Sequence, residues 1–225
     1  MSGTYRFERS DEISIAELNL REEFVEILDI IEKETARVVE MATTLSEGKI
    51  ELVRKAYDNV RALKEEAQKK KEEVMEYLIR VSPNLLNKEM YVFAMLHLDS
   101  LAQYIDELAH RLTLLTNFDD EGASKEVLEG LLQMSGGLLQ MVRKLREAAK
   151  SLAAGRSKLH EIHAEILASE DEMDLKYRKM LLRILENTRN LPHLFLTKEA
   201  LSVAEEASDK IREASHVFRY LALTG

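Results

Sequence analysis

The chain has 225 residues, of which 45% are hydrophobic, so it is long enough to bury a substantial core. Its 41 acidic residues outnumber 32 basic ones and give a formal net charge of -9, which disfavours nucleic acid as the main ligand. The absence of cysteine excludes disulfides, thiolate metal ligands and a cysteine nucleophile. The sequence shows no apolar secretion signal and no run near the roughly 18 apolar residues of a membrane-spanning helix, so we expect a cytoplasmic protein.

Apolar residues recur at intervals of three and four along the chain, and only 2 Pro and 8 Gly interrupt them, which predicts amphipathic helices. Helix ends are expected at Gly48, Pro83, Gly155 and Pro192, because glycine suits a left-handed helix end and proline interrupts a helix. Thr197 is the expected N-cap of the last helix. The expected helices cover residues 13–45, 49–80, 87–117, 124–154, 156–190 and 197–221.

The chain shows the pattern of an internal repeat. A shift of 106 residues lays the third expected helix on the sixth and places His110 on His216. A shift of 107 brings Gly48 onto Gly155. A generic helical protein also aligns apolar stripes at some shifts, but the coinciding breaks favour two copies of a three-helix unit. The aligned apolar pairs are Ala94 with Ala200, Leu98 with Ala204, Leu101 with Ala207 and Ile105 with Ile211.

These patterns predict an all-α fold of six long antiparallel helices, arranged as two repeated three-helix bundles. The first repeat is expected to span residues 1–118 and the second residues 119–225, docked into one compact domain. An approximate twofold axis would then superpose residues 50–118 on residues 156–224.

Two pairs of carboxylates are candidates for a metal site. Glu170 and Asp174 lie four residues apart on the fifth expected helix, and Glu205 and Asp209 have the same spacing on the sixth. Residues at this spacing share one helix face, and an antiparallel helix pair would bring the four groups to comparable heights. Such a cluster suits divalent cations or iron and zinc. His216, seven residues after Asp209, is the candidate imidazole ligand.

The same residues also fit a simpler interpretation. In an acidic helical chain most such pairs belong to solvated helix faces, and Lys176, Lys210 and Arg212 are near enough in sequence to form a salt-bridge network instead. His216 would then be an exposed or capping histidine. Glu170 lies close to the apolar stripe of its helix, whereas Glu205 points away from its own, so any site is expected at the surface between helices.

Two three-helix repeats with Glu-x-x-x-Asp motifs, together with the ending LTKEALSVAEEASDKIREASHVFRYL, resemble the PhoU-like phosphate-transport regulators. The length and ending look most like the shorter branch that is often encoded beside Pit-type phosphate permeases. The resemblance implies a cytoplasmic helical protein that modulates phosphate uptake or signalling and binds metal ions through its acidic motifs. It also implies a phosphate transporter or a signalling protein as partner, and peripheral membrane association through that partner.

The N-terminal repeat departs from the family pattern. The 106-residue shift places the four C-terminal carboxylates on Lys64, Gln68, Asp99 and Gln103, so three of the four are lost. Since an ammonium group repels a cation and an amide is a weak ligand, a metal site is expected only in the C-terminal half.

Three functional hypotheses follow. The first is a non-enzymatic regulator or adaptor of phosphate transport that forms homo-oligomers. The second is a carboxylate-bridged metal store or metalloenzyme, a class that normally aims Glu-x-x-His pairs at the bundle core. Here such pairs occur at residues 107–110 and 213–216, outside the apolar stripes. The third is a helical scaffold without a ligand. No nucleophile-base pair or glycine-rich phosphate loop is recognisable, so we do not expect an enzyme.

Overall fold

Six long helices dominate the computed structural model, which describes residues 14–118, 125–152 and 156–224. The described residues include one short 3-10 turn and no β-strand. The elements are α1 (Ile15–Ser46), α2 (Ile50–Val81), η1 (Ser82–Asn84), α3 (Lys88–Leu115), α4 (Lys125–Ser151), α5 (Arg156–Asn187) and α6 (Leu191–Thr224).

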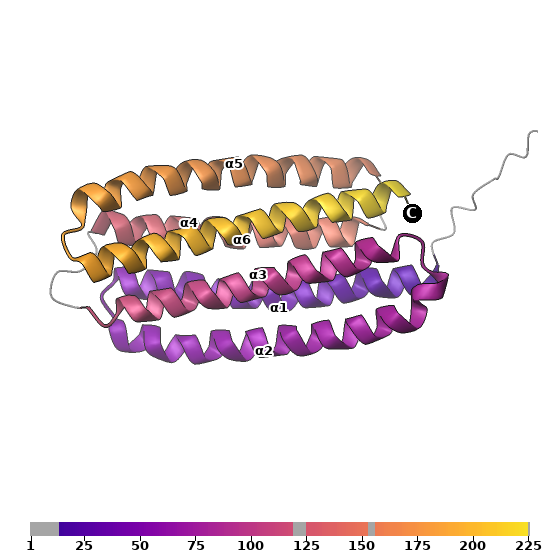
Figure 1. Ribbon diagram of the computed structural model, residues 1–225, viewed down its shortest axis with the longest axis horizontal. Coiled ribbons are helices and arrows are strands. Elements are labelled where there is room, and N and C mark those ends of the chain that lie inside the picture. Colours follow the sequence, from indigo (N-terminus) through magenta and orange to yellow (C-terminus); the bar gives the residue numbers. More distant parts are fainter. Residues whose placement is uncertain (1–13, 119–124, 153–155, 225) are drawn as a thin grey trace, which may run out of the picture.

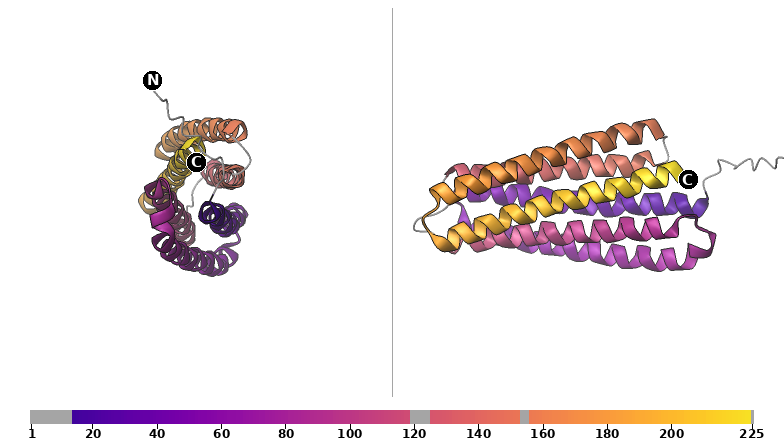
Figure 2. Two further views of the ribbon diagram at one scale, coloured as in Figure 1. Left: turned by 90° about the vertical axis from the view of Figure 1, so that its right-hand side faces the viewer. Right: turned by 45° about the horizontal axis from the view of Figure 1, so that its top comes forward.

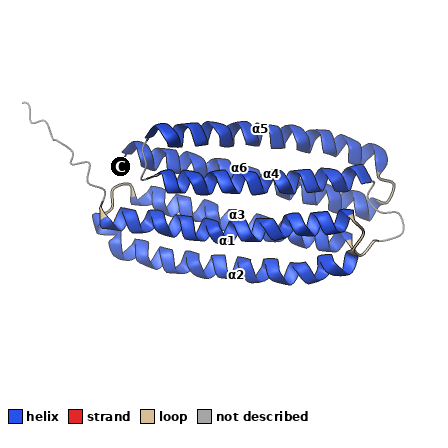
Figure 3. Cartoon of the chain, turned by 180° about the vertical axis from the view of Figure 1, so that it is seen from behind, coloured by secondary structure: helices blue, strands red, loops and turns tan. Residues whose placement is uncertain are grey.

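The helices form an elongated antiparallel bundle of two three-helix units, α1 to α3 and α4 to α6 (Figure 1). Between the units, α1 packs on α4 and α3 packs on α6. These four helices form the centre, and α2 and α5 lie at opposite edges, as the view along the bundle in Figure 2 shows. From behind, α1 and α4 lie in front of α3 and α6 (Figure 3). The structure confirms the predicted all-α bundle of six antiparallel helices.

The two units repeat the same packing pattern. In each, the first helix contacts the second and third, and the second contacts the third. Two aromatic pairs also occupy positions related by the 106-residue shift: Tyr57 packs on His110 with ring centroids 5.7 Å apart, and His163 packs on His216 at 4.7 Å. These contacts agree with the predicted duplication. The division at residue 118 stays a prediction, because the following residues 119–124 lie outside the described part of the chain.

Local chemistry explains most of the helix ends. Ser14 begins α1 through a capping box, in which its hydroxyl accepts from the Glu17 amide at 3.2 Å and the Glu17 carboxylate accepts from the Ser14 amide at 3.1 Å. Gly48 has a φ of 72° after the end of α1, the left-handed conformation that its position in the sequence predicted. Asn87 adopts the same region, with a φ of 55°, immediately before α3. The predicted helix end at Gly155 lies outside the described residues.

The sequence misplaced the connection between the last two helices. It predicted a stop before Pro192 and a new start at Thr197, but α5 already ends at Asn187 and α6 begins at Leu191. Proline is well suited to the first turn of a helix, where its missing N–H has no partner to lose. The Asn190 side chain accepts a hydrogen bond from the His193 amide at 3.2 Å and caps this start. Thr197 is therefore a buried residue within the helix, not its N-cap.

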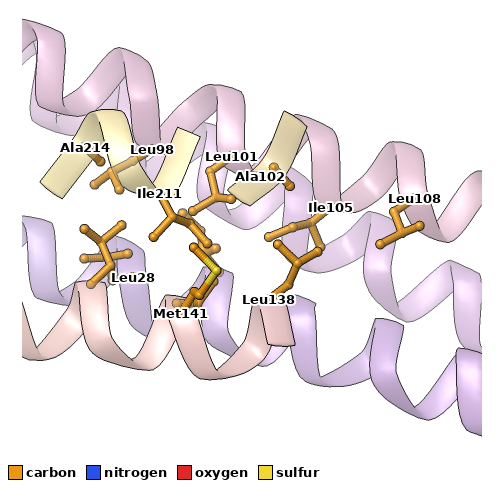
Figure 4. Close-up of a cluster of buried hydrophobic side chains, with 14 of the residues drawn as sticks. Leu28, Leu98, Leu101, Ala102, Ile105, Leu108, Leu138, Met141, Ile211 and Ala214 are labelled. Carbon is orange, nitrogen blue, oxygen red and sulfur yellow. The ribbon is translucent and has the colours of Figure 1, made fainter. Parts of the chain in front are cut away.

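One continuous core joins both units. Phe24 of α1 is fully buried, and its ring lies 6.0 Å from Tyr91 of α3 and 5.4 Å from Phe218 of α6, measured between centroids. Burying a side chain of this size contributes about 1.5–3 kcal/mol. The core therefore ties the halves together across the bundle. Figure 4 shows the same convergence further along, where residues of α1, α3, α4 and α6 meet: Leu28, Leu98, Leu101, Leu138, Met141 and Ile211.

Candidate functional site

The structure brings the four predicted carboxylates together between α5 and α6. Glu170 and Asp174 come from α5, and Glu205 and Asp209 come from α6. The charges of Asp174 and Asp209 both raise the pKa of Glu170 and that of Glu205, so these side chains lie within electrostatic reach of one another. The short connection from residue 188 to 190 folds α6 back along α5 and makes this meeting possible.

The four groups differ in their exposure. Glu170 is only 4% exposed, because it lies on the buried face of α5 between Ile166 and Met173. Asp174 and Asp209 are half-buried. The expectation of a site wholly at the surface is therefore wrong for Glu170. A residue next to the apolar stripe of its helix is buried when that stripe packs against the neighbouring helix.

An arginine lies among these carboxylates. Arg212 of α6 donates from Nη1 to Glu170 Oε1 at 2.6 Å and pairs through Nη2 with Asp209 Oδ1 at 3.0 Å. Arg178 pairs with Asp174 at 3.2 Å on the outer side of α5. We call this group, with Glu205, the Arg212 cluster. Its contacts are those of a salt-bridge network that links two helices.

The other two cations that the sequence offered for this network pair elsewhere. Lys176 lies 3.9 Å from Glu172, and Lys210 donates to Glu213 at 2.7 Å. Arg212 is therefore the cation that the fold places between Glu170 and Asp209.

The four carboxylates of the Arg212 cluster carry more negative charge than its two arginines, Arg212 and Arg178, offset. Burial raises the pKa of Glu170 to about 7, and a hydrogen bond with Asp209 and the charges of Asp174 and Asp209 add to the effect against the opposing influence of Arg212. Burial and the same two aspartates also raise the pKa of Glu205. A site with this balance takes up a proton or a cation more readily than exposed carboxylates do.

The geometry fits an ion-pair cluster better than a metal centre. A metal held by Glu170 and Asp209 would meet the guanidinium of Arg212, which already bonds to both and repels a second cation. Among the described residues, no group of three or more His, Asp or Glu side chains has an arrangement suited to a metal ion. Metal binding by Glu170, Asp174, Glu205 and Asp209 therefore stays a prediction that requires Arg212 to move.

His216 contacts a histidine instead of the carboxylates. It is exposed, and its ring packs edge-on, at an interplanar angle of 67°, against His163 of α5. It is not among the principal groups that shift the pKa of Glu170 or Glu205. His163 is only 2% exposed, and its Nδ1 lies 3.0 Å from the hydroxyl of Ser215. Since that hydroxyl donates to the Arg212 carbonyl, it accepts from Nδ1–H of His163.

Sequence analysis did not single out His163. Burial and the neighbouring cationic groups lower the pKa of His163 to about 4. One signal was available, because His163 lies seven residues before Glu170 and four after Leu159, on the buried face of α5. His163 and Glu170 thus form a polar row on a helix face that otherwise enters the core.

The N-terminal unit holds a pair of opposite polarity at the equivalent place. Lys64 and Asp106 occupy the positions that correspond to Glu170 and Arg212, and the Lys64 charge lowers the pKa of Asp106 against the stronger effect of burial. Each unit therefore places one acidic and one basic residue between its second and third helices. In the N-terminal unit the second helix carries the base, whereas in the C-terminal unit it carries the acid. This arrangement supports the prediction that a metal site, if present, is confined to the C-terminal half.

A buried acid beside this pair was also missed. Glu34 of α1 is fully buried, and neither of its carboxylate oxygens has a hydrogen-bond partner among the described residues. Burial, followed by the charge of Asp106, raises the pKa of Glu34 well above its usual range against the opposing charge of Lys64, so the fold favours the protonated carboxyl. The signal was its position between Ile31 and Val38, which are three residues before it and four after it on the apolar stripe.

Comparison with known proteins identifies a shared fold. No family model and no curated protein matches the sequence. The solved structure of PhoU from Pseudomonas aeruginosa matches with a TM-score of 0.70 and 14% identity, over 93% of this chain and 98% of that one. A candidate PhoU-like phosphate regulatory protein from Shewanella oneidensis MR-1 matches with a TM-score of 0.76 and 10% identity, over 92% and 100%. A further PhoU-like protein from that organism matches with a TM-score of 0.76 and 11% identity, over 92% of this chain and 100% of that one. The chain thus has the PhoU-like fold.

Proposed function

We propose that this protein is a non-enzymatic regulator of phosphate transport or signalling that acts by binding other proteins. The observation that carries the proposal is the match to PhoU-like folds, which covers 93% and 92% of this chain and 98% and 100% of the two matched chains. At identities of 10% to 14% the structural match shows the fold alone, so the proposed function rests on this fold together with the acidic motifs of residues 170–174 and 205–209.

The proposed place of action is the cytoplasmic side of a phosphate transporter, or of the signalling protein associated with it. None of the described helices has a stretch long and apolar enough to cross a bilayer. We therefore propose that any attachment to the membrane is through the partner. The shorter branch encoded beside Pit-type permeases is the closest functional analogy that the sequence suggests.

In this proposal the Arg212 cluster holds α5 and α6 in a fixed register. Glu170 is buried and pairs with Arg212, so the pair adds a specific polar link to the apolar packing between the two helices. A partner surface that drew Arg212 away would leave Glu170 to take up a proton, because its pKa is already raised to about 7. The position of Arg212 near the surface of the bundle would thereby control the protonation of the buried Glu170.

The test is phosphate uptake in the native host. Cells that lack the gene should take up labelled phosphate at a rate that no longer follows the external phosphate supply, and the wild-type chain should restore the response. An Arg212→Gln chain should restore it less well, whereas Arg37→Gln, at an exposed site on α1, should act as wild type. Unchanged uptake and signalling in the deletion strain would contradict the proposed function.

The alternative is a carboxylate metal store or metalloenzyme. One observation favours it, namely that burial and carboxylate repulsion raise the pKa of both Glu170 and Glu205, as expected where a positive charge is missing. The alternative requires purified protein to carry metal in a fixed ratio to the chain. Metal-free protein that still restores phosphate regulation would eliminate it.

A further inference from the structure

The outer face of α5 carries an apolar stripe that the bundle does not cover. Leu175, Leu182 and Leu185 are 52%, 62% and 59% exposed. They are separated by seven and three residues, the spacing at which side chains form the contact seam between two packed helices. Because α5 lies at the edge of the bundle and packs mainly on α4 and α6, this face is open along its length (Figure 1).

The stripe is specific to α5 and is not shared by the other edge helix. The 106-residue shift places the three leucines of α5 on Lys69, Glu76 and Ile79 of α2, so two of the three equivalent positions are charged. An edge helix of this fold is therefore stable without leucines at these three positions. Exposed leucines at seam spacing are characteristic of an interaction surface.

We propose that this face of α5 is a homodimer interface, in which α5 packs antiparallel to α5 of a second copy about a twofold axis. A twofold interface uses the same surface on both subunits, so it must be complementary to itself. With Leu182 opposite Leu185 of the partner subunit, symmetry places Leu185 opposite Leu182 of the partner subunit. Four leucines then form the centre of the contact.

The charges beside the stripe match the same register. Lys179 and Glu186 are exposed and seven residues apart, on the flank of the leucine seam. The midpoint between residues 179 and 186 lies within one residue of the midpoint between 182 and 185, so a single twofold axis serves both pairs. Lys179 therefore meets Glu186 of the partner subunit, and the contact occurs twice. Such flanking pairs set the partner and orientation of packed helices.

The charges also select the antiparallel orientation. In a parallel pair, Arg178, which occupies a seam position between Leu175 and Leu182, would face Arg178 of the partner subunit. In the antiparallel register Arg178 and Leu175 both lie beyond the end of the opposite helix, since α5 ends at Asn187, so the contact rests on Leu182 and Leu185. Arg178 is free there to keep its pair with Asp174.

Sedimentation or light scattering tests the interface directly. The wild type should be dimeric at tens of micromolar, and Leu182→Glu and Leu185→Glu should each give monomer because they place carboxylates inside the leucine layer. The matched control is Ile79→Glu on α2, which is equivalent to Leu185 and 72% exposed, and which should leave the dimer intact. Circular dichroism should show unchanged helicity in all three variants, because each changed side chain is exposed.

Charge exchange tests the register. Lys179→Glu should weaken the dimer by about tenfold in Kd, because two attractive pairs become repulsive. The double variant Lys179→Glu/Glu186→Lys should recover the wild-type Kd. A monomeric wild type, a dimer that survives both leucine variants, or a double variant no tighter than the single one would overturn the proposal. A monomer that binds a different protein through these leucines would overturn it equally, in favour of another partner.

Discussion

Arg212 reaches across from α6 and donates to the buried carboxylate of Glu170 on α5 at 2.6 Å. The contact joins residues 42 positions apart and places a charged pair inside a mainly apolar helix interface, which also holds the contact between His163 and Ser215. Removing the cationic partner of a buried carboxylate costs free energy, because the carboxylate then either stays charged without that hydrogen bond or must take up a proton. This pair is therefore the point at which the proposed site and the stability of the bundle are coupled.

Removing the arginine should destabilise the protein. Arg212→Ala leaves Glu170 without its partner and should lower the free energy of unfolding by about 1–3 kcal/mol, measured by urea denaturation at pH 7.5. Arg178→Ala is the control, because Arg178 is largely exposed and its pair with Asp174 should contribute less than about 1 kcal/mol. Equal stability of both variants and the wild type would show that Glu170 does not depend on Arg212.

The buried acid of the N-terminal unit should make stability depend on pH. A carboxyl whose pKa is raised on folding holds its proton longer in the folded state, so the folded state loses relative stability as pH rises above the unfolded pKa of about 4.3. Burial raises the pKa of Glu34 in this way. As pH rises, Glu34 should therefore lower the free energy of unfolding by up to about 1.4 kcal/mol per pH unit until the pKa of the folded state is passed.

The measurement is urea denaturation of the wild type and Glu34→Gln between pH 5 and 8. The difference in stability between them should move in favour of the variant as pH rises, because glutamine does not ionise. Using the difference removes the contribution of Glu170, whose raised pKa acts in the same direction in both proteins. Glu22→Gln, at an exposed position on α1, should run parallel to the wild type. Parallel curves for Glu34→Gln would mean that Glu34 is ionised when folded.

The ends of the helices were predictable where the residue at the break favours only one kind of helix terminus. Gly48 marks a left-handed helix end in sequence and in structure, with a φ of 72°. Pro192 has two meanings, since proline ends one helix and suits the first turn of the next, and the sequence alone chose the wrong one. The choice depends on the Asn190 side chain, which accepts from the His193 amide and starts α6 before the proline.

The site was predictable in its location but not in its contacts. Spacing within each helix placed Glu170 beside Asp174, and the short loop brought α6 alongside. The choice of Arg212 over Lys210 as the bridging cation depends on the rotation of α6 about its axis, which no spacing within α5 defines. Glu34 was missed for a different reason, because a charged residue within an apolar stripe is normally interpreted as an interruption of the stripe.

A buried histidine in the C-terminal unit should have the opposite pH dependence to Glu34. The pKa of His163 is lowered to about 4, chiefly by burial, so its stability contribution is complete above the unfolded pKa of about 6.5 and is lost as pH falls towards 4. Nuclear magnetic resonance of the ring protons should show no titration of His163 between pH 8 and 5. His163→Gln should remove this part of the acid-induced loss of stability. A midpoint near 6.5 would contradict the neutral, buried assignment.

Calorimetric titration with divalent and iron or zinc ions decides between the two interpretations of the acidic motifs. Any cation that enters must displace Arg212 from Glu170 and Asp209, so Arg212→Ala should bind it more tightly than the wild type. Asp174→Asn/Asp209→Asn should lose binding, because it removes two of the four carboxylates. Asp99→Asn should retain it, since Asp99 belongs to the N-terminal unit and pairs with Lys71 at 2.8 Å. Equal heats in all four proteins would leave Glu205 and Asp209 as charged residues of a helix surface, with Arg212 as the cation that Glu170 and Asp209 share.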